Sequence, residues 1–263
     1  MDKNIDPKPK KALGQNFLLN EEILQDIVNE ADIEKTDTIL EIGPGRGSLT
    51  ELLIREAGRV IAIEKDGELV GLLKDKFSNT KNLEVIEGDI RNFTLKEKPY
   101  KLVANIPYYL SNFILRKFLE SENKPQKIVL LLQKEVAERI CEDPGKMSLV
   151  SVMVNFYGKP RLGRIIQKEN FEPVPKVDSR VIVVSDIKTP DNINEKLFFR
   201  ILKVSFAQKR KKLINNLYNG LKIDKSELLK MIKSIGQKET ARAQELSLKN
   251  WHDLYKKISE ITR

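Results

Sequence analysis

The chain has 263 residues, of which 40% are hydrophobic and 32% charged, and this composition predicts a globular protein with one large domain and one smaller one. Its only histidine is His252 and its only cysteine is Cys141, so a His/Cys zinc cluster, a Ser-His-Asp triad and an internal disulfide are all excluded. We therefore expect no metal centre, and chemistry that uses amides, carboxylates, backbone groups and a bound cofactor.

The net charge of +9 is unevenly distributed. Residues 1–184 hold 29 basic and 29 acidic side chains, whereas residues 185–263 hold 18 basic and 9 acidic ones. A basic module beside a neutral one indicates a polyanionic partner, with nucleic acid first, although a solvated lysine-rich surface is the alternative. No apolar run has the length of a signal-peptide core or a membrane span, so we expect a cytoplasmic protein without membrane contact.

The first 19 residues are predicted to form an arm that ends in the run Gly14-Gln15-Asn16-Phe17-Leu18. Apolar residues then recur with helical spacing from Ile23 to Ala31, and Asn20 is a suitable N-cap for this helix.

A strand from Thr38 to Ile42 leads into the turn Glu41-Ile42-Gly43-Pro44-Gly45-Arg46-Gly47. A helix follows, and we expect it to begin with a capping box of Ser48 and Glu51. Strand, glycine turn and helix in this order are typical of a nucleotide-binding site, because glycines let the backbone approach a ligand closely. The spacing G-x-G-x-G differs from the dinucleotide fingerprint, but this turn alone also allows a dehydrogenase.

Polar side chains follow the next three predicted strands at their carboxyl ends. Glu64 follows Arg59–Ile63, Asp89 comes after Leu83–Ile86, and Asn105 follows Tyr100–Ala104. Parallel strands present these ends at one edge of a sheet, where a carboxylate can accept both hydroxyls of a ribose. Either carboxylate alone could be a helix cap. Together with the glycine turn that ends the first strand, however, the four strand ends predict a crevice shaped for a nucleoside.

The loop Asn105-Ile106-Pro107-Tyr108-Tyr109-Leu110-Ser111 is the most informative stretch of the chain. Asn105 offers a side-chain carbonyl, and Pro107 stiffens the turn so that the carbonyl of Ile106 can point outward. Tyr108 offers a flat ring beside these two acceptors. This arrangement suits the amino group of a planar base, and the alternative is an ordinary turn with its tyrosines packed at the rim.

Beyond this loop we predict strands over Gln126–Leu132, around Val150–Phe156 and over Ser179–Val184. Before the last of these, prolines two residues apart hold the run Phe171-Glu172-Pro173-Val174-Pro175 extended. This loop could present Phe171 as a second aromatic face opposite Tyr108, and burial of Phe171 in the core is the alternative.

Residues 189–263 are predicted to be helical after a linker at Thr189-Pro190-Asp191. The run Lys209-Arg210-Lys211-Lys212 opens the second of these helices and forms a dense positive end that suits RNA. His252 lies in a polar helical stretch and is expected at the surface.

Taken together, the motifs resemble the ribosomal RNA adenine N6,N6-dimethyltransferases of the small-subunit type, within the S-adenosylmethionine-dependent methyltransferases. The resemblance rests on residues 13–18, 41–47, 64, 88–89, 105–111, 171–179, 206–213, 242 and 245–247. It implies an α/β fold, with a Rossmann-like, mostly parallel sheet of the class I methyltransferase type and a small all-helical C-terminal domain. The expected parts are the arm at 1–19, the methyltransferase domain at 20–188 and a basic RNA-binding domain at 189–263.

Together with the glycine turn, the resemblance implies S-adenosylmethionine as cofactor and assigns residues to each role. The cofactor-binding residues are Asn16, Leu18, Glu41, Gly43, Gly45, Glu64, Asp89 and Asn105, with Glu64 on the ribose and Asp89 on the adenine amino group. The catalytic residues are Asn105, Ile106, Pro107, Tyr108 and Phe171, and the RNA-binding residues are Lys209, Arg210, Lys211 and Lys212.

The implied activity is methyl transfer to N6 of two adjacent adenosines near the 3′ end of 16S ribosomal RNA, by a monomer acting during small-subunit biogenesis. Tyr109 and the basic run from Lys209 favour the small-subunit group over the large-subunit enzymes of the macrolide-resistance type. A non-catalytic RNA-binding relative and a DNA adenine methyltransferase are further alternatives. The intact Asn105 loop argues against the first of these, and the basic tail argues against the second.

Overall fold

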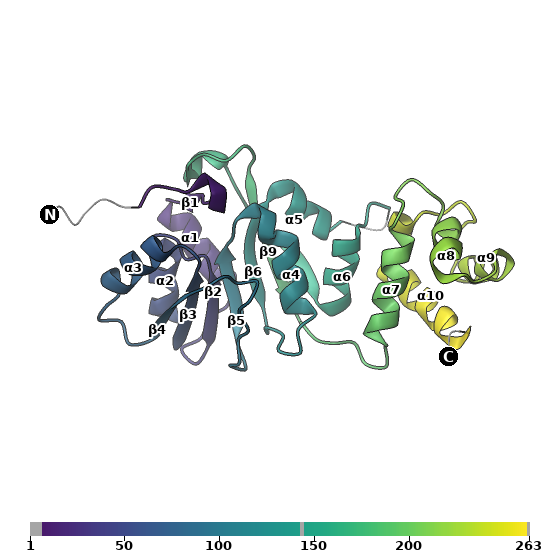
Figure 1. Ribbon diagram of the computed structural model, residues 1–263, viewed down its shortest axis with the longest axis horizontal. Coiled ribbons are helices and arrows are strands. Elements are labelled where there is room, and N and C mark those ends of the chain that lie inside the picture. The colour runs from purple at the N-terminus through teal and green to yellow at the C-terminus, as the bar shows by residue number, and fades with distance from the viewer. Residues whose placement is uncertain (1–6, 143–144, 262–263) are drawn as a thin grey trace. The chain divides into compact units, whose positions relative to one another are not determined.

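The computed structural model describes residues 7–142 and 145–261, which belong to two compact units (Figure 1). The N-terminal unit contains the described residues up to 137 together with 158–187. The C-terminal unit contains those of 138–157 and those from 188 onward. The described residues of 138–157, which were predicted to lie in the methyltransferase domain, thus group with the C-terminal helices.

A mostly parallel sheet forms the centre of the N-terminal unit, as predicted. Its strands are β2 (Thr38–Ile42), β3 (Arg59–Glu64), β4 (Leu83–Glu87), β5 (Lys101–Asn105), β6 (Ile128–Gln133), β7 (Lys159–Ile166) and β9 (Ser179–Ser185). They lie in the order β4-β3-β2-β5-β6-β9-β7, and only the pairs that involve β9 are antiparallel. After β2 the next strands are added toward one edge of the sheet, and after β5 they are added toward the other edge. Open α/β sheets bind ligands at the point where the strand order reverses in this way.

Five of the described α-helices begin in the same unit, and the first two of them pack on the sheet in one core cluster. The five are α1 (Glu21–Asn29), α2 (Ser48–Glu56), α3 (Gly67–Lys76), α4 (Ser111–Leu119) and α5 (Lys134–Ile140). The side chain of Asn20 caps α1, as expected, by accepting a hydrogen bond from the amide of Ile23 at 3.2 Å. Ile27 of α1 and Leu53 of α2 belong to one apolar cluster with Val103 and Val129 of the sheet. Burial of this cluster holds β2 and β5, and hence their carboxyl ends, in place.

The predicted capping box at the start of α2 is wrong. Gly47 occupies the cap position with φ of 81°, a left-handed conformation that favours glycine, and Ser48 is already the first helical residue. The amide of Glu51 donates to the carbonyl of Gly47 at 3.0 Å. Because a capping serine must precede the first helical turn, Ser48 stands one position too late for that role.

The C-terminal unit is helical, and it corrects one predicted strand. Its helices are α6 (Leu149–Tyr157), α7 (Glu195–Ser205), α8 (Leu213–Leu221), α9 (Lys225–Ser234) and α10 (Leu248–Ile261). The segment Val150–Phe156 is helical because its apolar residues surround the helix, and a short all-apolar run has no period that separates a buried helix from a strand. The additional strand of the sheet is instead β7.

Aromatic packing around α6 also corrects the prediction for His252. The ring of Phe156 stacks on Phe198 with centroids 4.4 Å apart, and the imidazole of His252 lies 5.9 Å from the ring of Phe156. His252 is therefore half-buried rather than a surface residue, and burial lowers the pKa of its imidazole.

Candidate active site

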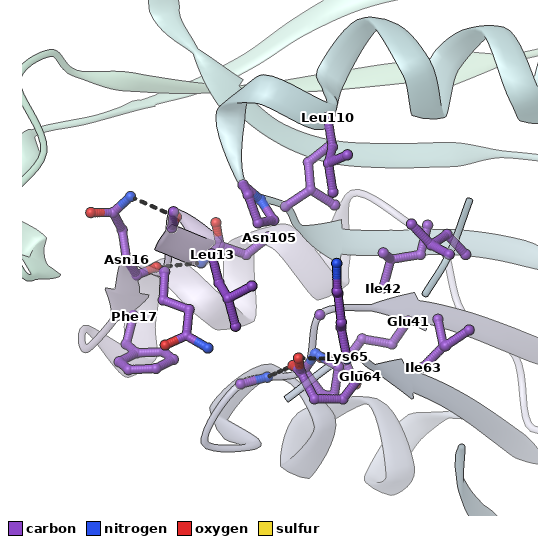
Figure 2. A pocket seen from close by; sticks show the side chains of 18 of the residues that line it. Leu13, Asn16, Phe17, Glu41, Ile42, Ile63, Glu64, Lys65, Asn105 and Leu110 are labelled. Atoms are coloured by element: carbon purple, nitrogen blue, oxygen red, sulfur yellow. Dashed lines mark hydrogen bonds between the residues drawn. The ribbon is translucent and has the colours of Figure 1, made fainter. Parts of the chain in front are cut away.

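A large cavity opens at the carboxyl edge of the sheet, where the four predicted strand ends meet. It encloses about 1060 Å³ of space, a volume that includes the open solvent at its mouth. The predicted site residues on its wall are Asn16, Leu18, Glu41, Gly43, Gly45, Glu64, Asp89, Asn105, Ile106, Pro107 and Tyr108. Figure 2 shows Asn16 beside Asn105, with Glu64 across the cavity from them. Parallel strand order alone brings most of these residues together, because it aligns the strand ends.

The glycine turn after β2 is built for close approach of a ligand. Gly43 has φ of 67°, and a Cβ added there would meet nothing within 4 Å, so its backbone faces open space. Gly45 has φ of 59°, and a Cβ there would lie 2.8 Å from the ring of Phe17. The turn thus leaves room for a ligand at Gly43 and for the N-terminal segment at Gly45.

Glu64 at the end of β3 is held by the backbone on both carboxylate oxygens. Its Oε1 accepts from the amides of Lys65 at 2.8 Å and Asp66 at 3.0 Å, and its Oε2 accepts from the amide of Gly45 at 3.2 Å. Burial raises the pKa of Glu64, while these three hydrogen bonds oppose the rise. The carboxylate is fixed in direction at the cavity wall, which suits recognition of a ligand with paired hydroxyls.

Glu41 lies deeper, on β2, and is 1% exposed. Burial raises the pKa of its carboxyl to about 8, and the nearby carboxylate of Glu64 acts in the same direction. Within the described part of the chain, Oε2 of Glu41 has no hydrogen-bond partner. Burial therefore favours the protonated form of Glu41 at neutral pH.

Asp89, which follows β4, is an ionised carboxylate at the far side of the cavity. The guanidinium of Arg91 contacts its Oδ2 at 2.5 Å, and the ammonium of Lys65 contacts the same oxygen at 3.1 Å. The hydrogen bonds from Arg91 lower the pKa of Asp89 well below its usual range.

The Asn105 loop is fixed by side-chain hydrogen bonds at both ends. Nδ2 of Asn105 donates to the main-chain carbonyl of Asn16 at 3.2 Å, and this leaves Oδ1 as the free acceptor. The hydroxyls of Tyr108 and Ser179 lie 2.6 Å apart, and Ser111 Oγ donates to the carbonyl of Tyr108 at 2.7 Å. Tyr109 is 62% exposed at the mouth. The loop therefore presents an oriented acceptor and a braced aromatic ring.

Phe171 does not supply the predicted second aromatic face. It is 2% exposed and belongs to the apolar core cluster together with Leu18. The reason is a two-stranded sheet, β1 (Phe17–Leu18) with β8 (Phe171–Glu172), in which Leu18 pairs with Phe171. The Phe171 ring thus lies in the core cluster and is not among the residues that line the cavity.

The basic run lies in the C-terminal unit and does not form part of a helix. Lys209, Arg210, Lys211 and Lys212 are all exposed and precede α8, with Lys212 as its cap residue. Lys212 Nζ lies 3.9 Å from Glu239 Oε1, the outer limit of an ion pair. The run is a solvated, positively charged surface.

Several residues of the site were not predicted from the sequence. Lys10 and Gln15 both contact Asp66, and Ser179 braces Tyr108. The only local signal was at Asp66, an acidic residue directly before a helix, where it caps α3 through the amide of Glu68 at 3.2 Å.

The residues that the structure describes contain no group of three or more His, Cys, Asp or Glu side chains placed to hold a metal ion. None of the helices among them is long and apolar enough to cross a membrane.

Known proteins resemble this chain along nearly its whole length. A sequence profile of the family described as ribosomal RNA adenine dimethylase matches residues 7–260. The ribosomal RNA small subunit methyltransferase A of Dehalococcoides mccartyi (strain CBDB1) is 40% identical, over 94% of this chain and 87% of that protein. The protein of the same name from Fusobacterium nucleatum is 36% identical, over 95% of this chain and 97% of that protein.

Solved structures agree with these relatives. A dimethyladenosine transferase from Plasmodium falciparum superimposes with a TM-score of 0.80 at 26% identity, over 93% of this chain and 98% of that chain. The 23S rRNA methyltransferase ErmE shares the fold, with a TM-score of 0.78 at 23% identity over 92% and 99% of the two chains. With its class I methyltransferase fold and its strand-edge cavity, the chain belongs to the ribosomal RNA adenine dimethylase family.

Proposed function

We propose that this protein transfers methyl groups from S-adenosylmethionine to N6 of two adjacent adenosines near the 3′ end of 16S ribosomal RNA, giving N6,N6-dimethyladenosine. The observation that carries the proposal is the placement of the oriented Asn105 acceptor and the braced Tyr108 ring on the wall of the cavity at the carboxyl edge of the sheet. The small-subunit substrate is supported by the names of the relatives from D. mccartyi and F. nucleatum.

The residues of the cavity fit the cofactor. S-Adenosylmethionine, when bound, supplies a methyl group activated by its sulfonium charge. Glu64 would accept from the ribose hydroxyls, because backbone amides already fix its direction. Asp89 would accept from the adenine amino group, and the open backbone of Gly43 would receive the methionine part.

Asn105 and Ile106 would orient the target amino group. The Asn105 amide donates through Nδ2 to Asn16, so its Oδ1 is the atom left to accept a hydrogen from an adenine N6. The carbonyl of Ile106 would accept the second hydrogen. Two acceptors on the amino hydrogens draw the nitrogen lone pair out of conjugation and aim it at an electrophile.

Tyr108 would carry the adenine on its ring after the base has left its helix. Its hydroxyl is held by Ser179, and burial raises the pKa of that hydroxyl, so the ring stays neutral and fixed in plane. A dimethylated product needs no tuned base, because the protonated amine formed in each transfer is acidic and loses its proton to water. This agrees with a chain that has one histidine, placed in the C-terminal unit.

The exposed basic run from Lys209 to Lys212 would bind the RNA backbone in a sequence-independent way. We further propose that the protein acts as a monomer in the cytoplasm. Large-subunit methylation is the competing function, because the fold is shared with a 23S rRNA methyltransferase.

The test is nucleoside mass spectrometry after reaction with purified protein and labelled S-adenosylmethionine. Small-subunit particles that lack the modification are the substrate, and large-subunit particles and duplex DNA are the controls. We expect N6,N6-dimethyladenosine only in the 16S-type RNA. Monomethyladenosine as the sole product, or label confined to large-subunit RNA, would contradict the proposal and leave the methyltransferase fold intact.

A further inference from the structure

The described part of the N-terminal arm, residues 7–19, runs along the cavity and is fastened at three points. These are a polar triangle at the end of β3, a clamp on the glycine turn and a contact with the catalytic loop. The arm thus touches both the ribose side and the base side of the proposed site.

The first point is a triangle of Lys10, Gln15 and Asp66. Lys10 Nζ lies 2.7 Å from Asp66 Oδ1, and Gln15 Nε2 donates to Asp66 Oδ2 at 3.1 Å. Gln15 Oε1 in turn accepts from the amide of Lys10 at 2.7 Å. The side chain of Asp66 is only 3% exposed, so the ion pair is shielded from water on the carboxylate side. Asp66 stands two residues beyond Glu64.

The second point is a clamp by Arg46 of the glycine turn. Its guanidinium lies 4.6 Å from the ring centroid of Phe17 and donates to the carbonyl of Pro7 at 3.3 Å. It also pairs at 3.0 Å with Glu172 of β8, the strand that pairs with β1. The arm is therefore held on both sides of Asn16.

The third point is the hydrogen bond from Nδ2 of Asn105 to the main-chain carbonyl of Asn16 at 3.2 Å. This bond selects one of two amide orientations. In the opposite orientation the NH₂ group of Asn105 would face the target amino group, and two donors would oppose each other. The position of the Asn16 carbonyl therefore decides whether Asn105 can act as an acceptor.

We propose that Lys10, Gln15 and Asp66 are positioning residues for methyl transfer, which act through the Asn16 carbonyl to keep the Asn105 amide in its accepting orientation. The inference rests on the proposed function and deepens it. The arm would then connect the end of β3, where the cofactor ribose would bind, with the Asn105 amide, which orients the base. The position of the bound cofactor and the orientation of the Asn105 amide are then coupled through this arm.

The experiment uses the 263-residue chain and first compares it with four variants of the arm. Lys10→Met removes the ammonium, and Lys10→Arg restores a cation that can reach Asp66. Lys11→Met is the matched control, since Lys11 is its exposed neighbour on the same arm. Gln15→Leu tests the second side of the triangle. Asp66 itself is left unchanged because it also caps α3.

Single-turnover rates are measured at saturating S-adenosylmethionine and small-subunit particles, with cofactor affinity from calorimetry. We expect Lys10→Met and Gln15→Leu to lower the saturated rate by about tenfold or more, the scale of a catalytic group that is displaced by less than an ångström. Lys10→Arg should recover most of that rate, and Lys11→Met should match the wild type. Hydrogen exchange over residues 13–19 should rise in the two slow variants only.

A double-mutant cycle decides whether the effect passes through Asn105. In an Asn105→Ala background, Lys10→Met should cause no further loss of rate, because the group that it positions is gone. Additive losses would overturn the inference, and so would a Lys10→Met variant whose rate at saturating cofactor equals that of the wild type. If the wild type itself fails to methylate the particles, the proposed function fails instead, so the two failures are distinguishable.

Discussion

The amide of Gly45 donates to Oε2 of Glu64 across 3.2 Å, so the glycine turn after β2 orients the carboxylate at the end of β3. The carboxyl ends of the neighbouring strands β2 and β3 are thereby joined at the point where the cofactor would bind. The amides of Lys65 and Asp66 hold the other oxygen. A carboxylate with three such bonds cannot rotate away when a ligand arrives.

We expect Glu64→Ala to lose about 1–3 kcal/mol of S-adenosylmethionine binding free energy, the usual contribution of hydrogen bonds to a charged group. Glu64→Gln should lose less, because it keeps one oxygen acceptor at the same distance from the backbone. Titration calorimetry measures both. A dissociation constant unchanged in Glu64→Ala would remove this residue from the cofactor site.

Asn105→Ala should lower the rate at saturating substrates by about 10²–10³-fold, the effect of deleting one group that is positioned for the transition state. Cofactor affinity should change little, since the other cavity residues remain. Asn105→Asp keeps an acceptor oxygen but loses the donor to Asn16, so its rate should lie between those of Asn105→Ala and the wild type. Near-normal turnover by Asn105→Ala would exclude the proposed role.

The sequence predicted those parts of the site that follow from strand order. Glu64, Asp89 and Asn105 each follow an apolar run, and parallel pairing brings the ends of such runs to one edge without further information. The same rule predicted the mostly parallel sheet.

Features that depend on distant partners could not be predicted. Phe171 is buried because it pairs with Leu18, a partner more than 150 positions earlier in the chain. Lys10 meets Asp66 across 56 positions, and no local pattern marks either residue as a partner. The error at Val150–Phe156 has a different origin, since an apolar run without alternation carries no period to distinguish helix from strand.

Glu41 should make stability depend on pH. Its carboxyl has a pKa of about 8 in the folded protein and about 4.5 when exposed, so between these values the folded state holds a proton that the unfolded state releases. The contribution of Glu41 to the free energy of unfolding is therefore fully present below a pH of about 4.5. It is lost as the pH rises toward 8, by up to about 1.4 kcal/mol per pH unit.

The measurement is denaturant unfolding of the wild type and Glu41→Gln across this pH window, followed by a probe in the N-terminal unit. The glutamine cannot ionise, so the free energy of unfolding of the variant should increase relative to that of the wild type as the pH rises. Parallel curves would mean that Glu41 is not protonated in the folded state.

Neutralising Lys209, Arg210, Lys211 and Lys212 together should weaken RNA binding across sequences and flatten its salt dependence by roughly one unit of slope for each phosphate that the variant no longer neutralises. A matched control removes the same charge from exposed lysines of the N-terminal unit, namely Lys74, Lys81, Lys96 and Lys98. Filter binding at several salt concentrations compares the slopes. Equal slopes for the basic-run variant and the wild type would show that the run does not bind RNA.

The Tyr108 ring and its hydroxyl should have separable effects. Tyr108→Ala removes the stacking surface and should weaken engagement of the target base by about 1–3 kcal/mol. Tyr108→Phe keeps the ring and loses only the 2.6 Å hydrogen bond to Ser179, which is worth about 0.5–1.5 kcal/mol. Ser179→Ala deletes the same bond from the other side, so its effect should match that of Tyr108→Phe, and the double variant should be no worse than either. Single-turnover titrations with small-subunit particles give the half-saturating concentration for each variant. If Tyr108→Phe were as defective as Tyr108→Ala, the hydroxyl rather than the ring face would be the functional group, and the stacking role would be excluded.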